Sequence, residues 1–203
     1  MTSELIISVS GLRGIVGESL TPAVAWRYAR AFADALPPGD MIVTRDGRAN
    51  GSQLLAPVAS GLSQDGLRKV LDAGFAATPT TGVLVRSAGC AGGVQISASH
   101  NPAEYNGLKL FSAEGRVLPA SVGQMVLSRF QMLDVEYSLS SNQQPASGIQ
   151  LFADTTSEHL ALVNRIVDVA AIRARRFRVL LDANHGSGSV LGRVLLDLLG
   201  CDV

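Results

Sequence analysis

Two kinds of apolar segment alternate along the chain. Short segments with two to four apolar residues predict strands, and they lie at residues 5–9, 41–44, 68–71, 93–96, 108–111 and 177–181. Longer segments with apolar residues three or four positions apart predict helices, and they begin near Thr21, Leu54, Ala77, Ala120 and Thr156, with a last one ending at Leu199. This alternation favours an α/β fold in which a mostly parallel, mixed sheet is sandwiched by helices.

A change of composition divides the chain. Residues 134–150 are rich in Ser, Asn and Gln and include Pro145, which is typical of a linker. We therefore predict one α/β domain over residues 1–150 and the incomplete beginning of a second, similar α/β domain over residues 151–203. The predicted strand at 177–181 would have an open edge in such a unit, so self-association through that edge is expected.

Charge and cysteine content exclude several classes of protein. The 203 residues carry 17 basic and 17 acidic side chains, so no net charge draws the chain to nucleic acid or to a membrane surface. Cys90 and Cys201 are too few for a disulfide framework or a zinc site. No apolar run is long enough to span a bilayer, and no leader precedes the first strand, so we expect a reduced, cytoplasmic setting.

The richest chemistry lies between the strands predicted at 93–96 and 108–111. A turn carries the hydroxyls of Ser97 and Ser99, the imidazole of His100 and the amide of Asn101, and Lys109 follows on the next strand. A nucleophile, proton-handling groups and a positive charge together suit phosphate transfer. The alternative is a polar turn of ordinary composition. Lys69 is the only other lysine in the chain, so an amine beside this turn is unusual here.

Two further segments could bring groups to the same place. Residues 10–17 contain three glycines around Arg13, which indicates either a flexible loop or an anion-binding loop. The turn at 45–48 places Asp46 and Arg48 two residues apart, and a local ion pair is expected there. All these loops follow predicted strands, so in a parallel sheet they would meet on one rim. A Gly-rich turn at 182–188 precedes the last helix but lacks the lysine and spacing of a P-loop.

These motifs resemble those of a known family. The string Ser-Ala-Ser-His-Asn-Pro at 97–102, the Tyr-Asn-Gly-Leu-Lys at 105–109 and the Ser-Gly-Leu-Arg-Gly at 10–14 are similar to segments of the α-D-phosphohexomutases. That family includes phosphoglucomutase, phosphomannomutase and phosphoglucosamine mutase. The resemblance implies the phosphohexomutase domain I fold, and it covers only the N-terminal part of such an enzyme.

The resemblance also implies a reaction and a role for each residue. Phosphate would move between positions 1 and 6 of a hexose phosphate through a phosphoserine and a hexose 1,6-bisphosphate, which also acts as activator. Ser99 would carry the phosphoryl group and, through its phosphate, bind Mg²⁺. Arg13 would stabilise the phosphate charge, and Lys109 would bind phosphate and act as general acid or base. His100 would handle a proton or orient the loop. Asn101 would hold the loop by hydrogen bonds and bind the substrate or its phosphate.

The chain departs from the family in one respect. The family's magnesium loop has three alternating aspartates, and no two aspartates here are separated by a single residue. We therefore expect this polypeptide to lack mutase activity by itself. An alternative is a non-catalytic truncated product or sugar-phosphate-binding module. An ordinary nucleotide-binding domain is disfavoured because the first Gly-rich segment lacks a dinucleotide fingerprint.

Overall fold

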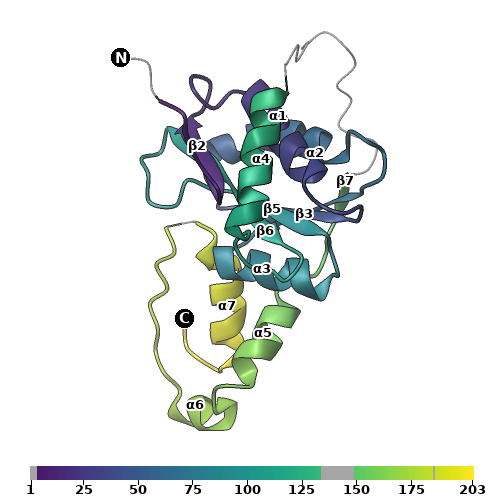
Figure 1. Cartoon of the computed structure of the whole chain (residues 1–203). Helices are drawn as coiled ribbons and strands as arrows, with labels where there is room; N and C mark the ends of the chain where they lie inside the picture. Colours follow the sequence, from purple (N-terminus) through teal and green to yellow (C-terminus); the bar gives the residue numbers. More distant parts are fainter. Residues whose placement is uncertain (1–3, 134–148, 185) are drawn as a thin grey trace.

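A seven-stranded mixed sheet forms the centre of the protein (Figure 1). The computed structural model describes residues 4–133, 149–184 and 186–203. The strands lie in the order β1-β2-β6-β5-β3-β4-β7. Their bounds are β1 Ile6–Ser8, β2 Gly11–Ile15, β3 Met41–Arg45, β4 Val70–Phe75, β5 Gly92–Ile96, β6 Tyr105–Ser112 and β7 Ile149–Leu151.

The α/β class is confirmed, but the expectation of a mostly parallel sheet is wrong. Three of the six strand pairings in the described chain are parallel, and the other three are antiparallel. The connection from β5 to β6 spans eight residues, 97–104, and contains no helix. A parallel crossover needs a dozen residues or more, so β6 must run back antiparallel to β5.

The segment around Arg13, expected to be a loop, is strand β2. Gly11 makes this possible because β2 lies very close to β6 at that point. A Cβ atom at position 11 would lie 2.2 Å from the carbonyl oxygen of Leu108, and the φ angle of Gly11 is +156°. Arg13 therefore projects from a strand held on both sides, by β1 and by β6. Glycines that look like loop residues in the sequence here allow strand contact.

Helices cover both faces of the sheet. The helices α1 (Pro22–Asp34), α2 (Ser52–Ser63) and α4 (Ala120–Met132) pack together on one face, and α3 (Thr78–Ser87) lies on the other. Side chains alternate accordingly along β3. Met41 and Val43 join the larger core under α1 and α2, while Ile42 joins the smaller core under α3.

Two helix predictions show how local sequence sets these elements. Thr21 caps α1 by accepting a hydrogen bond from the backbone N–H of Val24 at 3.3 Å, and Pro22 occupies the first helical position, as expected. Helix α1 ends at Asp34, before the Pro37-Pro38 pair. The helix predicted to begin near Ala120 is also confirmed as α4.

The residues after β7 form three helices: α5 Ser157–Asn164, α6 Val169–Arg175 and α7 Gly188–Leu198. The strand expected at 177–181 is wrong. Arg178 makes a single parallel bridge to Asp202, and Leu180 is 95% exposed. A strand needs backbone hydrogen bonds to a neighbouring strand along its length. Within the described chain, residues 177–181 have only the single bridge to Asp202.

The division into domains at residue 150 stays a prediction. Residues 134–148 of the expected linker lie outside the described residues, and β7 begins directly after them and pairs parallel to β4. Helix α5 packs against α3, with Leu160 buried. Among the described residues, no helix combines the length and the apolar character needed to cross a bilayer.

Candidate active site

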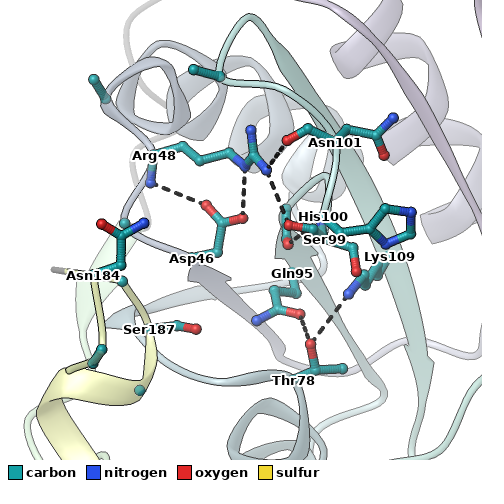
Figure 2. Close-up of a pocket in the computed structure, with 17 residues that line it drawn as sticks. Asp46, Arg48, Thr78, Gln95, Ser99, His100, Asn101, Lys109, Asn184 and Ser187 are labelled. Carbon is teal, nitrogen blue, oxygen red and sulfur yellow. Dashed lines mark hydrogen bonds and ion pairs between the residues drawn. The ribbon is translucent and has the colours of Figure 1, made fainter. Parts of the chain in front are cut away.

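A polar pocket of about 760 Å³ lies where β3 and β5 end, with α3 beginning beside it (Figure 2). Its walls come from the turn after β3, the loop after β5, the start of α3, strand β6 and the start of α7. They include Asp46, Arg48, Thr78, Gln95, Ser97, Ser99, His100, Asn101, Lys109, Asn184 and Ser187. The carboxyl ends of parallel strands are the usual ligand position in α/β sheets.

Strand register places several of these side chains on one face of the sheet. Gln95 of β5 lies opposite Lys109 of β6, and Arg13 of β2 lies opposite Gly107 of β6. Directly opposed residues share a face, and so do residues two apart on one strand. The groups at 13, 95 and 109 therefore all project on the side of the sheet that α3 covers. Strand β2, which is far from β5 and β6 in sequence, thus meets them at the loop that carries Ser99.

Arg13 reaches that loop because Gly107 leaves room for it. A Cβ atom at position 107 would lie 3.0 Å from Cγ of Arg13 and 2.4 Å from the carbonyl oxygen of Leu12. The guanidinium donates to Oδ1 of Asn101 at 3.4 Å. Arg13 and Lys109 also line a smaller adjoining hollow of about 270 Å³. Both cations that the sequence singled out therefore lie beside the Ser99 loop.

Ser99 adopts a backbone conformation that side-chain-bearing residues rarely take. Its φ angle is +59°, in the left-handed region, which costs about 1–2 kcal/mol for an L-residue. Its N–H donates to Oγ of Ser97 at 3.1 Å, and Ser97 is buried. The Ser99 residue itself is exposed at the pocket. Strained residues of this kind cluster at functional sites and persist only where their surroundings hold them.

Arg48 provides that hold. Its Nη1 donates to the carbonyl oxygens of Pro102 at 2.7 Å and Tyr105 at 3.2 Å. Its Nη2 donates to those of Ser99 at 3.0 Å and Asn101 at 2.7 Å (Figure 2). Its Nε donates to Oδ2 of Asp46 at 3.2 Å, so the expected ion pair is present. All five N–H groups of the guanidinium are used, three of them on the loop and one on Tyr105 at the start of β6.

Two asparagines support the same loop from behind, and the sequence alone did not indicate them as loop supports. Nδ2 of Asn50 donates to the carbonyl oxygen of Ala103 at 3.1 Å. Nδ2 of Asn106, which is fully buried, donates to Oδ1 of Asn50 at 2.8 Å. Buried amides with complete hydrogen bonding favour one arrangement over others. The Ser99 loop is consequently fixed along its length by the turn and short 3₁₀ helix after β3, which includes Asn50.

Lys109 is half-buried, and its environment disfavours the charged form. Burial lowers the pKa of its amine, the nearby Arg13 guanidinium lowers it further, and Asp46 opposes both effects. Its Nζ donates to Oγ1 of Thr78 at 3.2 Å. His100 is exposed and lines the same pocket. An amine with a lowered pKa in a cleft is the kind of group that transfers protons near neutral pH.

The start of α7 closes the pocket opposite the Ser99 loop. Ala183, Asn184, Gly186, Ser187 and Gly188 border it. The sequence indicated the Gly-rich turn and the helix after it, but their contact with the Ser99 loop joins segments more than 80 residues apart. His185 lies outside the described residues.

The family comparison agrees with the motifs. A model of the "phosphoglucomutase/phosphomannomutase, alpha/beta/alpha domain I" matches residues 5–135, which is more than half of the chain. The chain belongs to the phosphoglucomutase/phosphomannomutase family. The expected phosphohexomutase membership, with domain I at the N-terminus, is thereby confirmed.

Individual relatives extend well beyond this chain. A probable phosphoglucosamine mutase of Methanopyrus kandleri is 34% identical over 197 residues, covering 96% of this chain and 41% of the relative. A phosphoglucomutase/phosphomannomutase of Thermococcus kodakarensis is 33% identical, covering 95% and 42%. The crystal structure of Paramecium parafusin, a phosphoglucomutase, in its open form has a TM-score of 0.77 at 19% identity, covering 99% and 43%, which shows a shared fold. The chain thus spans about two fifths of the relatives that it matches.

Proposed function

We propose that this chain is the phosphoserine-bearing N-terminal part of a phosphohexomutase, with Ser99 as the phosphoryl carrier. One observation carries the proposal: an exposed serine in a strained conformation, held by Arg48, lines one pocket with Lys109 and His100, and Arg13 bonds to Asn101 of the same loop. A resting loop this strongly held suits a nucleophile that must meet two different acceptors in one geometry.

In the proposed reaction the O–P bond of phosphoserine breaks as a hydroxyl of the hexose phosphate attacks phosphorus. The product is a hexose 1,6-bisphosphate and a free Ser99 hydroxyl. The bisphosphate reorients so that its other phosphate faces Ser99. The Ser99 hydroxyl then attacks this phosphate and becomes phosphorylated again. The net change is movement of phosphate between positions 1 and 6, and added bisphosphate would act as activator by phosphorylating free Ser99. Catalysis of this kind rests on positioning and charge stabilisation.

Each neighbouring side chain has a task in this scheme. Lys109 acts as general acid and base: its ammonium gives a proton to Oγ of Ser99 as the O–P bond breaks, and the amine takes the proton back when Ser99 attacks the bisphosphate. The ammonium also contacts phosphate, and the proton of the attacking hydroxyl passes to His100 or to water. Arg13 stabilises the negative charge of the phosphoryl group. His100 either handles a second proton or orients the loop, and Asn101 binds substrate while its Oδ1 holds Arg13.

Magnesium needs a fuller donor set than the described residues offer. The proposal makes phosphorylated Ser99 one ligand, but no group of three or more His, Cys, Asp or Glu side chains converges anywhere in the part of the chain that the structure describes. Asp46, a carboxylate that lines the pocket, is bonded to Arg48. The residues present therefore do not fit a complete Mg²⁺ site, and no step above is assigned to the metal.

The substrate class is a hexose phosphate. The pocket volume of about 760 Å³ suits a ligand of that size, and its walls are polar and cationic. Glucose, mannose and glucosamine phosphates all remain candidates, since the relatives named above differ in this respect. A cytoplasmic setting fits such a metabolite. Because the chain spans about two fifths of its relatives, the 203-residue polypeptide alone is expected to be inactive, as a non-catalytic truncated product would be.

The test uses the gene product that carries residues 1–203, assayed with glucose 1-phosphate, mannose 1-phosphate and glucosamine 6-phosphate in the presence of Mg²⁺ and a hexose 1,6-bisphosphate. We expect turnover with at least one of these substrates, and Ser99→Ala should reduce it by about 10⁴-fold or more. Ser87→Ala, on the far end of α3, is the matched control and should leave turnover unchanged. Turnover that survives Ser99→Ala would reject the proposal.

A further inference from the structure

A short chain of hydrogen bonds joins the interior of the sheet to the amine of Lys109. Gln95 and Lys109 face each other across the antiparallel pair β5 and β6, and Thr78, at the first position of α3, lies between their side-chain ends. Oγ1 of Thr78 lies 2.7 Å from Oε1 of Gln95 and 3.2 Å from Nζ of Lys109. Gln95 is 1% exposed, so its amide is out of reach of solvent.

The direction of these bonds follows from the partners at the buried end. Nε2 of Gln95 lies 2.8 Å from the carbonyl oxygen of Ala76, and a carbonyl can only accept, so the amide nitrogen must face it. Oε1 therefore faces Thr78, and an amide oxygen also can only accept. The single hydroxyl proton of Thr78 goes to Gln95, and only the lone pairs of Oγ1 remain for Lys109.

We propose that Thr78 and Gln95 are positioning residues for Lys109, holding its amine as a hydrogen-bond donor in the pocket that Ser99 lines. An ammonium group has three N–H bonds, so the bond to Thr78 leaves two that can point to a phosphate. If the Thr78 hydroxyl were free to rotate, it could instead donate to the neutral amine. Gln95 prevents this rotation and so favours the protonated amine. The consequence for catalysis rests on the function proposed above, but the hydrogen-bond chain does not.

The charged groups around Lys109 act in both directions. Arg13 on β2 disfavours the ammonium, as does burial, whereas Asp46 after β3 favours it. His100 and Arg48 border the same pocket, and Arg48 is already paired with Asp46. The oriented hydroxyl of Thr78 favours the ammonium form of Lys109, as Asp46 does. Removing it should therefore lower the pKa of Lys109 further, because a bond to the charged form is lost.

The chain offers a clean measurement because it has only two lysines. With lysine labelled with ¹³C at Cε, the 203-residue protein should give two titrating NMR signals, and exposed Lys69 serves as an internal control. Thr78→Val keeps the shape of the side chain and removes the hydroxyl. We expect it to lower the titration midpoint of Lys109 by about 0.5–1 pH unit, while Lys69 does not move.

Two further variants separate positioning from a merely structural role. Gln95→Met keeps the length of the side chain and frees the Thr78 hydroxyl, and it should lower the Lys109 midpoint in the same direction by about half as much. Thr78→Ser keeps the hydroxyl, so its Lys109 titration midpoint should equal that of the wild type. A structural role alone would change the unfolding temperature of these variants and leave the midpoint in place.

The result that overturns the inference is a Lys109 midpoint that stays within about 0.2 pH unit of wild type in both Thr78→Val and Gln95→Met. If Thr78→Val does not fold, Gln95→Met and Thr78→Ser decide the matter by themselves. No phosphoryl transfer enters this titration. A Ser99 that is never phosphorylated would therefore reject the proposed function and leave the positioning role of Thr78 and Gln95 intact. An unmoved Lys109 midpoint would reject the positioning role and leave the proposed function intact.

Discussion

Replacing Arg48 by lysine should release the Ser99 loop while keeping the positive charge. The guanidinium makes five hydrogen bonds at once, to three loop carbonyls, to the carbonyl of Tyr105 at the start of β6 and to Asp46. An ammonium has three N–H groups at one point and cannot span these acceptors. Ser99, held at a φ angle of +59°, then loses the contact that opposes its conformational cost.

The magnitude follows from which of these bonds water can replace. The acceptors Ser99 and Pro102 are exposed, so water takes over much of their bonding, and each loss costs about 0.5 kcal/mol. The bonds to Asn101 and Tyr105 are partly buried, and each is worth about 1–1.5 kcal/mol with a charged donor. The free energy of opening the loop should fall by about 3–4 kcal/mol in total.

Native-state hydrogen exchange measures this opening directly. The amide of Asn101, which donates to the carbonyl oxygen of Ala98 at 3.2 Å, lies within the loop. Its exchange in Arg48→Lys should be faster by about 100-fold or more, since each 1.4 kcal/mol is a factor of ten. Arg86→Lys, on an exposed turn of α3, is the matched control. An Asn101 amide that exchanges within about threefold of wild type in Arg48→Lys would refute the assigned role of the guanidinium.

Three other predictions concern packing, pH and turnover. Gly107→Ala should destabilise the protein by about 1–3 kcal/mol in urea unfolding, because its Cβ would meet backbone oxygens at 2.4 and 2.9 Å. The control Gly192→Ala in α7 meets only side-chain atoms at 3.5 Å and should be neutral or stabilising. Equal effects of the two substitutions would contradict the packing around Gly107. Burial lowers the pKa of His159 below its usual 6.5, so the unfolded chain binds the proton better and stability should fall as pH drops below about 6.5. His159→Gln should lose less stability between pH 7.5 and 5 than wild type does, and an identical loss would count against this assignment. The purified 203-residue chain should fold, seen as a cooperative thermal transition. It should turn over none of the three hexose phosphates at ordinary enzyme rates of about 1–10³ s⁻¹. Such turnover would show that the part of the relatives' length that this chain does not cover is dispensable.

The sequence predicted the elements better than their pairing. Apolar periodicity located α1, α2 and α4, and short apolar segments located β3 and β5, because those signals are local. The direction of β6 and the strand character of residues 11–15 depend on contacts between distant segments. Gly11 illustrates the difficulty. A glycine is equally suited to a flexible loop and to a close contact between two strands, and only the position of the partner strand β6 shows which of the two applies.

The candidate site shows the same division. Ser99, His100, Asn101 and Lys109 could be singled out because they lie within eleven residues and form an ordered motif. The support of Arg48 could not be predicted, because its acceptors are backbone carbonyls, which leave no mark in the sequence. Thr78 likewise reads as an ordinary helix start, and its contact with Lys109 arises only when α3 is placed against β5 and β6.

The central claim is that Ser99 carries the phosphoryl group, and locating a phosphate in the gene product tests it most directly. The gene product that carries residues 1–203 is incubated with a hexose 1,6-bisphosphate and Mg²⁺, digested, and analysed by fragment-ion mass spectrometry of the peptide containing residues 97–102. The account predicts one added phosphate on Ser99, absent from Ser99→Ala. Phosphate on Ser97, or on neither serine, would contradict it.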